Sequence, residues 1–199
     1  GMVAAYLLHQ DHEITVFEAA DYIGGHTNTV KVSMEGRGYA IDTGFIVFND
    51  WTYPNFIALL RKLGVESEPS DMSFGVKCER TGLEYNGTSL NTLFAQRRNL
   101  LRPSFYRMIR DILRFNRDSL ELLTLPEPGP SLGSYLETHR YSREFIEHYI
   151  VPMGAAIWST DARSMLAFPA RFFVRFLHNH GMLTVNDRPT WRTIRGGSA

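Results

Sequence analysis

The sequence predicts an α/β fold, in which the second half of a β-α-β unit is followed by a largely helical α+β region. Three observations support this prediction. Residues 2–10 have the composition of a helix, and after a polar turn residues 13–17 have the β-branched and aromatic character of a strand. Residues 103–123 then carry apolar side chains at the spacing of an amphipathic helix.

The composition is that of a globular protein. Of the 199 residues, 44% are apolar and 13% aromatic, which is enough for a sizeable core. Lysine plus arginine and aspartate plus glutamate each number 21, so the overall charge does not favour binding to nucleic acid. No nucleic-acid partner is therefore expected.

The single cysteine, Cys78, excludes a disulfide within the chain and a cysteine-cluster zinc site. One cysteine fits a reducing compartment, and we expect a cytoplasmic protein. No apolar run approaches the length that spans a bilayer, and the chain does not open with a basic and apolar leader.

The predicted helix at residues 2–10 has no Ser, Thr, Asp or Asn before it to cap its start. We therefore expect that the chain is a fragment and that the first strand of the β-α-β unit precedes residue 1. In such units a Gly-rich turn, G-x-G-x-x-G, joins the strand to the helix. Gly1 stands at the position of its third glycine, and Glu18 then follows the first glycine at the roughly 20-residue spacing of a ribose-binding acid.

Glu18 ends the predicted strand, at a sheet edge where an acid can accept hydrogen bonds from the hydroxyls of an adenosine ribose. Taken alone, an ordinary surface glutamate is the simpler interpretation. Gly24 and Gly25 favour the binding interpretation, because paired glycines let the backbone approach a ligand and offer N–H groups to a phosphate. The stretch from Glu18 to Gly25 thus predicts a dinucleotide site.

The stretch ITVFEAADYIGGHTNTV, residues 14–30, resembles the flavoproteins with two dinucleotide-binding domains, which include flavin amine oxidases, phytoene-type desaturases and protoporphyrinogen oxidase. The resemblance implies a partial FAD/NAD(P)-binding Rossmann-like domain, with its first strand missing, and FAD as the cofactor. It also implies contacts with FAD from Gly1, Glu18, Gly24, Gly25, His26 and Thr27. The family commonly has Arg where this chain has His26, so a permanent charge near the pyrophosphate is replaced by a pH-sensitive or neutral group.

A second match lies in GYAIDTGFIVFND, residues 38–50. In the resembled family a D-x-G segment at this distance passes beside the flavin, which implies contacts from Asp42, Thr43, Gly44 and Phe45. A hairpin strand that closes on a tight turn is the alternative, and the first motif favours the flavin. Residues 30–34 and 37–41, separated by Glu35-Gly36, are predicted to form the hairpin that links the two motifs.

Over essentially all 199 residues the chain also resembles a bacterial subgroup described as predicted NAD/FAD-binding or amine-oxidase-like oxidoreductases. The stretches that carry this likeness include SDMSFGV, PMGAAIWST and FPARFFVRFLHNHGML. Members are longer and close the flavin site with a C-terminal G-D segment that this chain lacks. We therefore expect a partial FAD-binding domain at 1–50, a substrate or cap region at 51–190, and the start of a return into the FAD-binding domain at 191–199.

Three elements are predicted in the cap region. Thr52 is expected to cap a helix that extends through Leu63 and ends at Gly64. Residues 72–87 are expected to form two strands around a turn at residues 81–82. The helix at 103–123 is expected to bury an apolar stripe and to present an arginine face. The stripe comprises Phe105, Met108, Ile109, Ile112, Leu113, Phe115 and Leu120, and the face comprises Arg107, Arg110, Arg114 and Arg117, preceded by Arg97, Arg98 and Arg102.

Several cap features have two interpretations. The arginine face fits a membrane surface or an acidic partner, and it also fits a solvated helix face, which is the simpler explanation. The aromatic run at 168–181 favours a core, although the wall of a lipid-binding tunnel would use the same residues. The small residues around Gly154, beside Trp158, allow close approach of a ligand or of a packed helix. His178 and His180 point to different faces of a helix and have no acidic third ligand nearby, so no metal is expected.

The main prediction is a fragment of an FAD-dependent oxidoreductase that oxidises an amine or an apolar, lipid-like substrate by hydride transfer to the flavin. No nucleophile motif is present, and no catalytic residue is assigned. The fragment alone is expected to be inactive. The alternative is a non-catalytic interaction or membrane-surface domain derived from the same fold. A NAD-dependent dehydrogenase is disfavoured, because nothing after Glu18 resembles a nicotinamide site.

Overall fold

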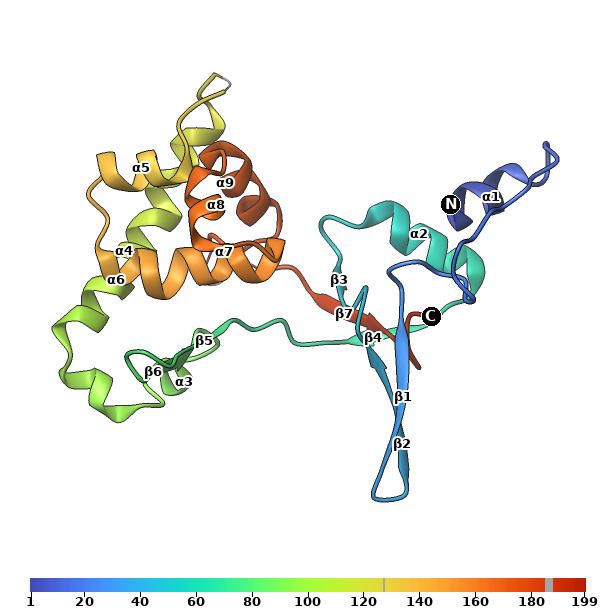
Figure 1. Cartoon of the computed structure of the whole chain (residues 1–199), viewed down its shortest axis with the longest axis horizontal. Helices are drawn as coiled ribbons and strands as arrows, with labels where there is room; N and C mark the ends of the chain where they lie inside the picture. The colour runs from blue at the N-terminus through green and yellow to red at the C-terminus, as the bar shows by residue number, and fades with distance from the viewer. Residues whose placement is uncertain (127, 185–187) are drawn as a thin grey trace. The chain divides into compact units, whose positions relative to one another are not determined.

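The structure is a computed structural model, and it describes residues 1–126, 128–184 and 188–199. The chain divides into two compact units (Figure 1). Unit 1 comprises Gly1–Asp71 and Thr190–Ala199, and unit 2 comprises Met72–Pro189. Helices and strands occur in both units, in agreement with the general α/β prediction. The ligand roles predicted for residues 1–50, 51–190 and 191–199 stay predictions.

Unit 1 is built from short helices and antiparallel strands. Its elements are α1 (Met2–Leu8), β1 (Thr29–Met34), β2 (Arg37–Asp42), β3 (Phe48–Asn49), α2 (Pro54–Leu63), β4 (Ser67–Pro69) and β7 (Trp191–Ile194). β1 pairs with β2, and β7 lies between β3 and β4 in a second sheet. The last strand of the chain thus joins two segments from near its start.

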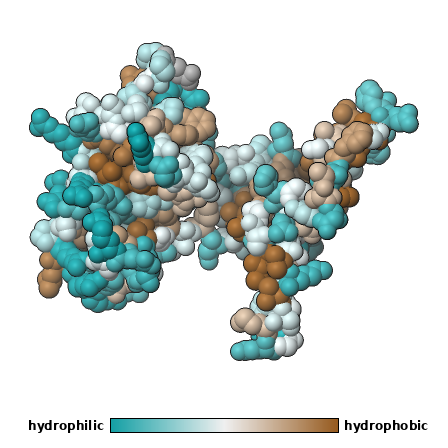
Figure 2. All heavy atoms as spheres, viewed as in Figure 1, coloured by the Kyte–Doolittle hydropathy of each residue, from teal (hydrophilic) through white to brown (hydrophobic). Residues whose placement is uncertain are grey.

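The predicted hairpin is confirmed as β1 and β2, which pair in register from Thr29 with Asp42 to Met34 with Arg37. Its turn residues, Glu35 and Gly36, have φ angles of 52° and 75°, the left-handed pair that a two-residue turn of this kind requires. One face of the hairpin carries exposed apolar side chains, because residues opposed in the register and residues two apart along a strand share a face; Figure 2 shows these side chains gathered along the hairpin. These side chains are Val30, Val32, Met34, Tyr39 and Ile41.

The predicted strand at residues 13–17 is wrong. This segment runs without regular structure, and no strand within the described residues pairs with it. Phe17, its last residue, is 91% exposed. A strand is held by ladder hydrogen bonds to a neighbour, and β propensity alone does not form one. The sheets of the described chain are all antiparallel, so they do not show the parallel sheet of a Rossmann-like domain.

The predicted helix that ends at Gly64 is confirmed as α2, with Pro54 in its first turn and Gly64 in the left-handed conformation at φ 67°. The predicted cap is wrong, because Tyr53 occupies the N-cap position and makes no capping hydrogen bond. The hydroxyl of Thr52 instead donates to Oδ1 of Asn49 at 3.0 Å. That oxygen also accepts the Thr52 N–H at 2.9 Å, so the buried Asn49 organises the entry to the helix.

Unit 2 is largely helical. Its elements are β5 (Gly75–Cys78), β6 (Leu83–Asn86), α3 (Leu90–Leu93), η1 (Arg97–Leu101), α4 (Pro103–Asp118), η2 (Ser119–Leu123), α5 (Leu132–Thr138), α6 (Arg143–Phe145), η3 (Ile146–Ile150), α7 (Val151–Trp158), α8 (Ala162–Ala167) and α9 (Ala170–Asn179). The predicted strand pair is confirmed as β5 and β6. α6, η3 and α7 follow one another without a break, and η3 is a single π-helical turn within this long helix.

The core of unit 2 is rich in aromatic side chains. Phe115, Phe145 and Phe173 are fully buried, and the ring of Phe115 lies 5.5 Å from that of Phe145 and 6.5 Å from that of Phe173. Part of the predicted aromatic run at 168–181 therefore joins the core, as the simpler interpretation expected, whereas Phe172 is 53% exposed. α9 supplies Ala170, Phe173, Val174 and Leu177 to it.

The amphipathic helix is confirmed as α4, with two differences. It ends at Asp118, and residues 119–123 continue as the 3-10 helix η2. Leu113 and Leu120, predicted to be buried, are 53% and 38% exposed, whereas Asp111 is buried. The spacing of apolar residues places the stripe only approximately, because the packed neighbour decides which side chains it covers.

Candidate functional site

Two segments predicted to bind FAD lie against each other in unit 1. The Thr43 N–H donates to the carbonyl oxygen of Asn28 at 2.9 Å, and Nδ2 of Asn28 donates to Oγ1 of Thr43 at 2.7 Å. A Cβ placed on Gly44 would lie 1.5 Å from the carbonyl oxygen of His26. Only glycine fits there, so the backbone after the glycine pair and the D-T-G segment are in direct contact.

The C-terminal segment closes onto this contact. Asp42 and Thr29 face each other across the hairpin, and the Thr29 hydroxyl donates to Oδ1 of Asp42 at 2.6 Å. The same Oδ1 accepts the Ser198 N–H at 2.9 Å, while the Ala199 N–H donates to Oγ1 of Thr29 at 3.0 Å. Three separate stretches of chain thus meet at one carboxylate.

The electrostatics of Asp42 follow from these contacts. Partial burial raises the pKa of its carboxyl, but the hydrogen bonds from Thr29 and Ser198 outweigh it, and the pKa is lowered from the ordinary value of 3.8. Asp42 is therefore a carboxylate at neutral pH, held by donors that prefer the charged form.

The glycine pair forms an exposed turn next to this contact. Gly24 and Gly25 have φ angles of 130° and 65°, and the Thr27 N–H donates to the carbonyl oxygen of Gly24 at 3.3 Å. A side chain on Gly25 would meet no atom within 4 Å, so the space over it is open. A ligand can therefore approach the backbone at Gly25 closely.

Glu18 is exposed, and its Oε1 accepts the N–H groups of Ala19 and Ala20 at 2.8 and 3.0 Å. Its second oxygen, Oε2, accepts no hydrogen bond from the described residues and is available to a ligand. Gly1 caps α1, and its carbonyl oxygen accepts the Ala5 N–H at 2.9 Å. Among the described residues, no hydrogen bond ties Glu18 or Gly1 to the glycine pair.

Phe45, the last residue of the predicted D-T-G contact, packs into an aromatic cluster. Its ring centroid lies 5.2 Å from that of Phe56 and 6.1 Å from that of Tyr53, both edge to face. The buried Phe48 joins the same cluster through Phe56 at 5.1 Å. Phe45 therefore anchors the D-T-G segment to α2.

The residues present fit the polar half of FAD. An exposed carboxylate with an unused oxygen suits the ribose hydroxyls, and an open glycine turn suits the diphosphate. At Gly44, where a Cβ would clash with the carbonyl oxygen of His26, the second motif packs directly against the first.

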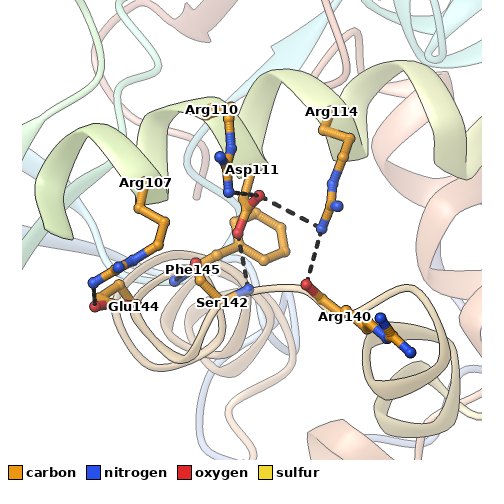
Figure 3. Close-up of polar contacts among 8 residues, drawn as sticks. All are labelled: Arg107, Arg110, Asp111, Arg114, Arg140, Ser142, Glu144 and Phe145. Atoms are coloured by element: carbon orange, nitrogen blue, oxygen red, sulfur yellow. Dashed lines mark hydrogen bonds and ion pairs between the residues drawn. The ribbon is translucent and has the colours of Figure 1, made fainter. Parts of the chain in front are cut away.

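The arginine face of α4 is mostly engaged inside unit 2 (Figure 3). Arg107 pairs with Glu144 at 2.6 Å, and the guanidinium of Arg114 lies 4.0 Å from the ring centre of Tyr141 and bonds the Arg140 carbonyl oxygen. Arg117 pairs with Asp118 at 2.6 Å. The predicted four-arginine face is therefore not a free cationic stripe.

Asp111 is the residue of α4 that the sequence did not indicate. It is buried, and its Oδ2 accepts the Ser142 N–H at 2.8 Å, at the N-cap of the helix α6–η3–α7. Arg114 and Arg110 lie 3.5 and 3.7 Å from its Oδ1. The carboxylate thus joins α4 to the start of the long helix.

At Gly154 the structure favours helix packing, since an added Cβ would lie 2.3 Å from Sδ of the buried Met165 in α8. Trp158 packs among phenylalanines, with Phe176 at 4.8 Å and Phe168 at 5.2 Å between ring centroids. Within residues 1–126, 128–184 and 188–199, no three His, Cys, Asp or Glu side chains gather as a metal ion would need.

The sequence prediction missed four residues of the contact in unit 1. Asn28 and Thr29 follow the glycine pair, and Gly197 and Ser198 reach them from the far end of the chain. The predicted hairpin, extended by one residue at its open end, places Thr29 opposite Asp42, and this was a usable signal. For the C-terminal pair, the sequence predicted only that residues 191–199 return into the FAD-binding domain, and not which residues they meet.

The comparison with protein families identifies the class. The family described as flavin containing amine oxidoreductase matches residues 1–197, so the chain is a flavoprotein by class. It belongs to the flavin-containing amine oxidoreductase family, and FAD is the expected cofactor. The comparison with curated proteins found no match to the chain. Of the helices that the structure describes, none is long and apolar enough to cross a membrane.

Proposed function

We propose that the chain carries the adenosine and diphosphate contacts of an FAD-dependent oxidoreductase, together with part of its substrate cap. Family membership supports the oxidoreductase activity, and a small-molecule substrate follows from it. The observation that carries the site is the direct contact between residues 26–28 and 43–44, which joins the two predicted FAD motifs. When bound, FAD supplies the electron acceptor for oxidation of an amine or an apolar substrate.

In this proposal the predicted residues from Glu18 to Phe45 contact different parts of FAD. Glu18 accepts hydrogen bonds from ribose hydroxyls, and the N–H groups at Gly24 and Gly25 receive the diphosphate. His26 and Thr27 border the diphosphate. The segment from Asp42 to Phe45 passes along the cofactor, where Gly44 keeps the backbone close and Phe45 fixes the segment to α2.

Unit 2 is proposed as the substrate cap. Its dense aromatic core around Trp158 and Phe173 supports a rigid scaffold for an apolar substrate. The sequence contains no nucleophile motif, and binding and orientation are the roles that we assign to the protein. A cytoplasmic location and a Rossmann-like arrangement of the FAD-binding part belong to the same proposal.

Substitution of Glu18 tests the site. Glu18→Gln keeps an oxygen for the Ala19 and Ala20 N–H groups and removes the charge offered to the ribose. Glu35→Gln, in the exposed hairpin turn, makes the same charge change away from the site. Each hydrogen bond to a charged group contributes about 1.5–3 kcal/mol, so the FAD dissociation constant should rise about tenfold or more for Glu18→Gln alone.

The measurement is a titration of FAD into the 199-residue chain, followed by quenching of flavin fluorescence. Circular dichroism of each variant checks that the fold is retained. If both substitutions change the dissociation constant equally, Glu18 does not bind the ribose.

A further inference from the structure

The chain around η1 has a charge pattern that the proposed function does not use. Residues 85–110 contain five arginines and neither aspartate nor glutamate, although the chain as a whole has a net charge of zero. These arginines are Arg97, Arg98, Arg102, Arg107 and Arg110. A cationic segment in a neutral protein points to an anionic partner.

Two leucines project from the same segment. Leu101 is 89% exposed and Leu100 is 47% exposed. Both line one open surface hollow in unit 2, and its other lining residues are Pro103, Tyr106, Arg107 and Arg110. We call these six residues the Leu–Arg surface. This surface combines aliphatic side chains with guanidinium groups. They come from η1 and from the first half of α4, which follows it in the chain.

The leucines are held outward by the local structure. Asn99, just before them, is fully buried, and the Arg102 N–H donates to its carbonyl oxygen at 3.2 Å. The hydroxyl of Tyr106 donates to the carbonyl oxygen of Leu100 at 3.0 Å, which ties the turn to α4. Their exposure is therefore built into a fixed turn.

The two arginines of this surface differ in how closely they are paired with acidic side chains. Arg107 is paired with Glu144 at 2.6 Å. Arg110 has a side chain 72% exposed, and its nearest acid, Asp111, lies 3.7 Å away and is shared with Arg114. Arg110 is thus the cation of the surface best placed for an external anion.

We propose that the Leu–Arg surface binds an anionic phospholipid bilayer, with Leu100 and Leu101 in the acyl boundary and Arg110 at the lipid phosphates. Leucines beside arginines, with no acid in the lining, match the chemistry of an interfacial membrane contact. This proposal is independent of the oxidoreductase function.

Other occupants fit less well. A second copy related by twofold symmetry would bring Arg107 and Arg110 toward their own equivalents, and like charges repel there. A bound peptide anchors a side chain in an enclosed pocket, whereas this hollow is open and Leu101 in its lining is 89% exposed.

Vesicle flotation tests the proposal with the 199-residue chain. We expect the protein to float with vesicles of phosphatidylcholine mixed with phosphatidylglycerol and not with phosphatidylcholine alone. Binding should weaken in raised salt, as the Debye length falls from about 10 Å at 0.1 M to about 3 Å at 1 M. Arg110→Gln should weaken binding about fivefold, and Leu100→Ser combined with Leu101→Ser about tenfold or more.

The controls are Leu113→Ser, a 53% exposed leucine on α4, and Arg163→Gln, an exposed arginine in α8. Both lie outside the Leu–Arg surface and should bind as the parent does, and circular dichroism verifies that each variant is folded. Equal binding to neutral and anionic vesicles, absence of binding to both, or loss of binding in the controls alone would overturn the proposal. A dimer in solution that the double leucine substitution dissociates would assign the surface to a second copy instead, which also overturns it.

Discussion

Gly44 lies where the two predicted FAD motifs touch, and its missing side chain is what lets them do so. Gly44→Ala would put a Cβ 1.5 Å from the carbonyl oxygen of His26, so the backbone must separate. We expect a loss of about 1–3 kcal/mol in the free energy of unfolding, measured in urea by the fluorescence of Trp51 and Trp191. Gly38→Ala is the matched control, since its Cβ would meet no atom within 4 Å. Equal midpoints for the two variants would show that the contact is absent in solution.

Asp42 gives the same contact a pH dependence. Its carboxyl pKa is lowered from 3.8 in the folded chain, so its charged form adds stability above that pH, and this contribution is lost as pH falls through the folded pKa. The difference in unfolding free energy between the parent and Asp42→Asn should therefore be largest near neutral pH and shrink in acid. Urea denaturation of both proteins along a pH series measures it. A difference that does not change with pH would contradict the role of the charge.

At the scale of elements, the link between α4 and the helix α6–η3–α7 depends on a buried carboxylate. Asp111→Ala would leave the Ser142 N–H without its acceptor and the neighbouring arginines without their anion. The expected loss is about 1.5–3 kcal/mol in unfolding free energy. Asp118→Ala, on the same helix, removes a carboxylate paired with the exposed Arg117 and should cost about 0–1 kcal/mol. The two losses are compared by urea unfolding with Trp158 as the probe, and equal values would argue against the link.

For the whole molecule, the distribution of core predicts that the two units differ in stability. Among the described residues, Phe48 and Leu60 are the buried apolar side chains of unit 1, while the remainder of the buried core belongs to unit 2. Less buried apolar area gives less stabilisation, so unit 1 should unfold at lower urea. Trp158→Phe leaves Trp51 and Trp191 as probes of unit 1, and Trp51→Phe with Trp191→Phe leaves Trp158 as the probe of unit 2.

The same pair of variants connects stability with the proposed function. A ligand that binds only the folded form stabilises it by RT ln(1 + [L]/Kd), so FAD should shift the transition of unit 1 more than that of unit 2. Coincident transitions without FAD would show one cooperative molecule. A shift confined to unit 2 would contradict the location of the predicted contacts.

Elements that depend on short-range sequence were predictable. The turn at Glu35-Gly36 brings β1 and β2 together because both residues adopt positive φ, and α2 begins near Pro54 and ends at Gly64 for equally local reasons. The strand predicted at residues 13–17 is not present in the structure. Their strand propensity was real, but a strand is completed by a partner, and the described residues provide none.

By itself, the sequence determined the hairpins, the amphipathic helix α4, the aromatic core and the likeness to flavin-containing amine oxidoreductases. Only the tertiary structure decided that Gly44 touches His26, that Ser198 closes onto Asp42, and that Asp111 is buried. The physical reason is the distance along the chain between the residues that interact. Turns, caps and helical periodicity are set by neighbours a few residues apart, whereas these contacts join stretches distant in the chain, and their partners are fixed only when the backbone has folded.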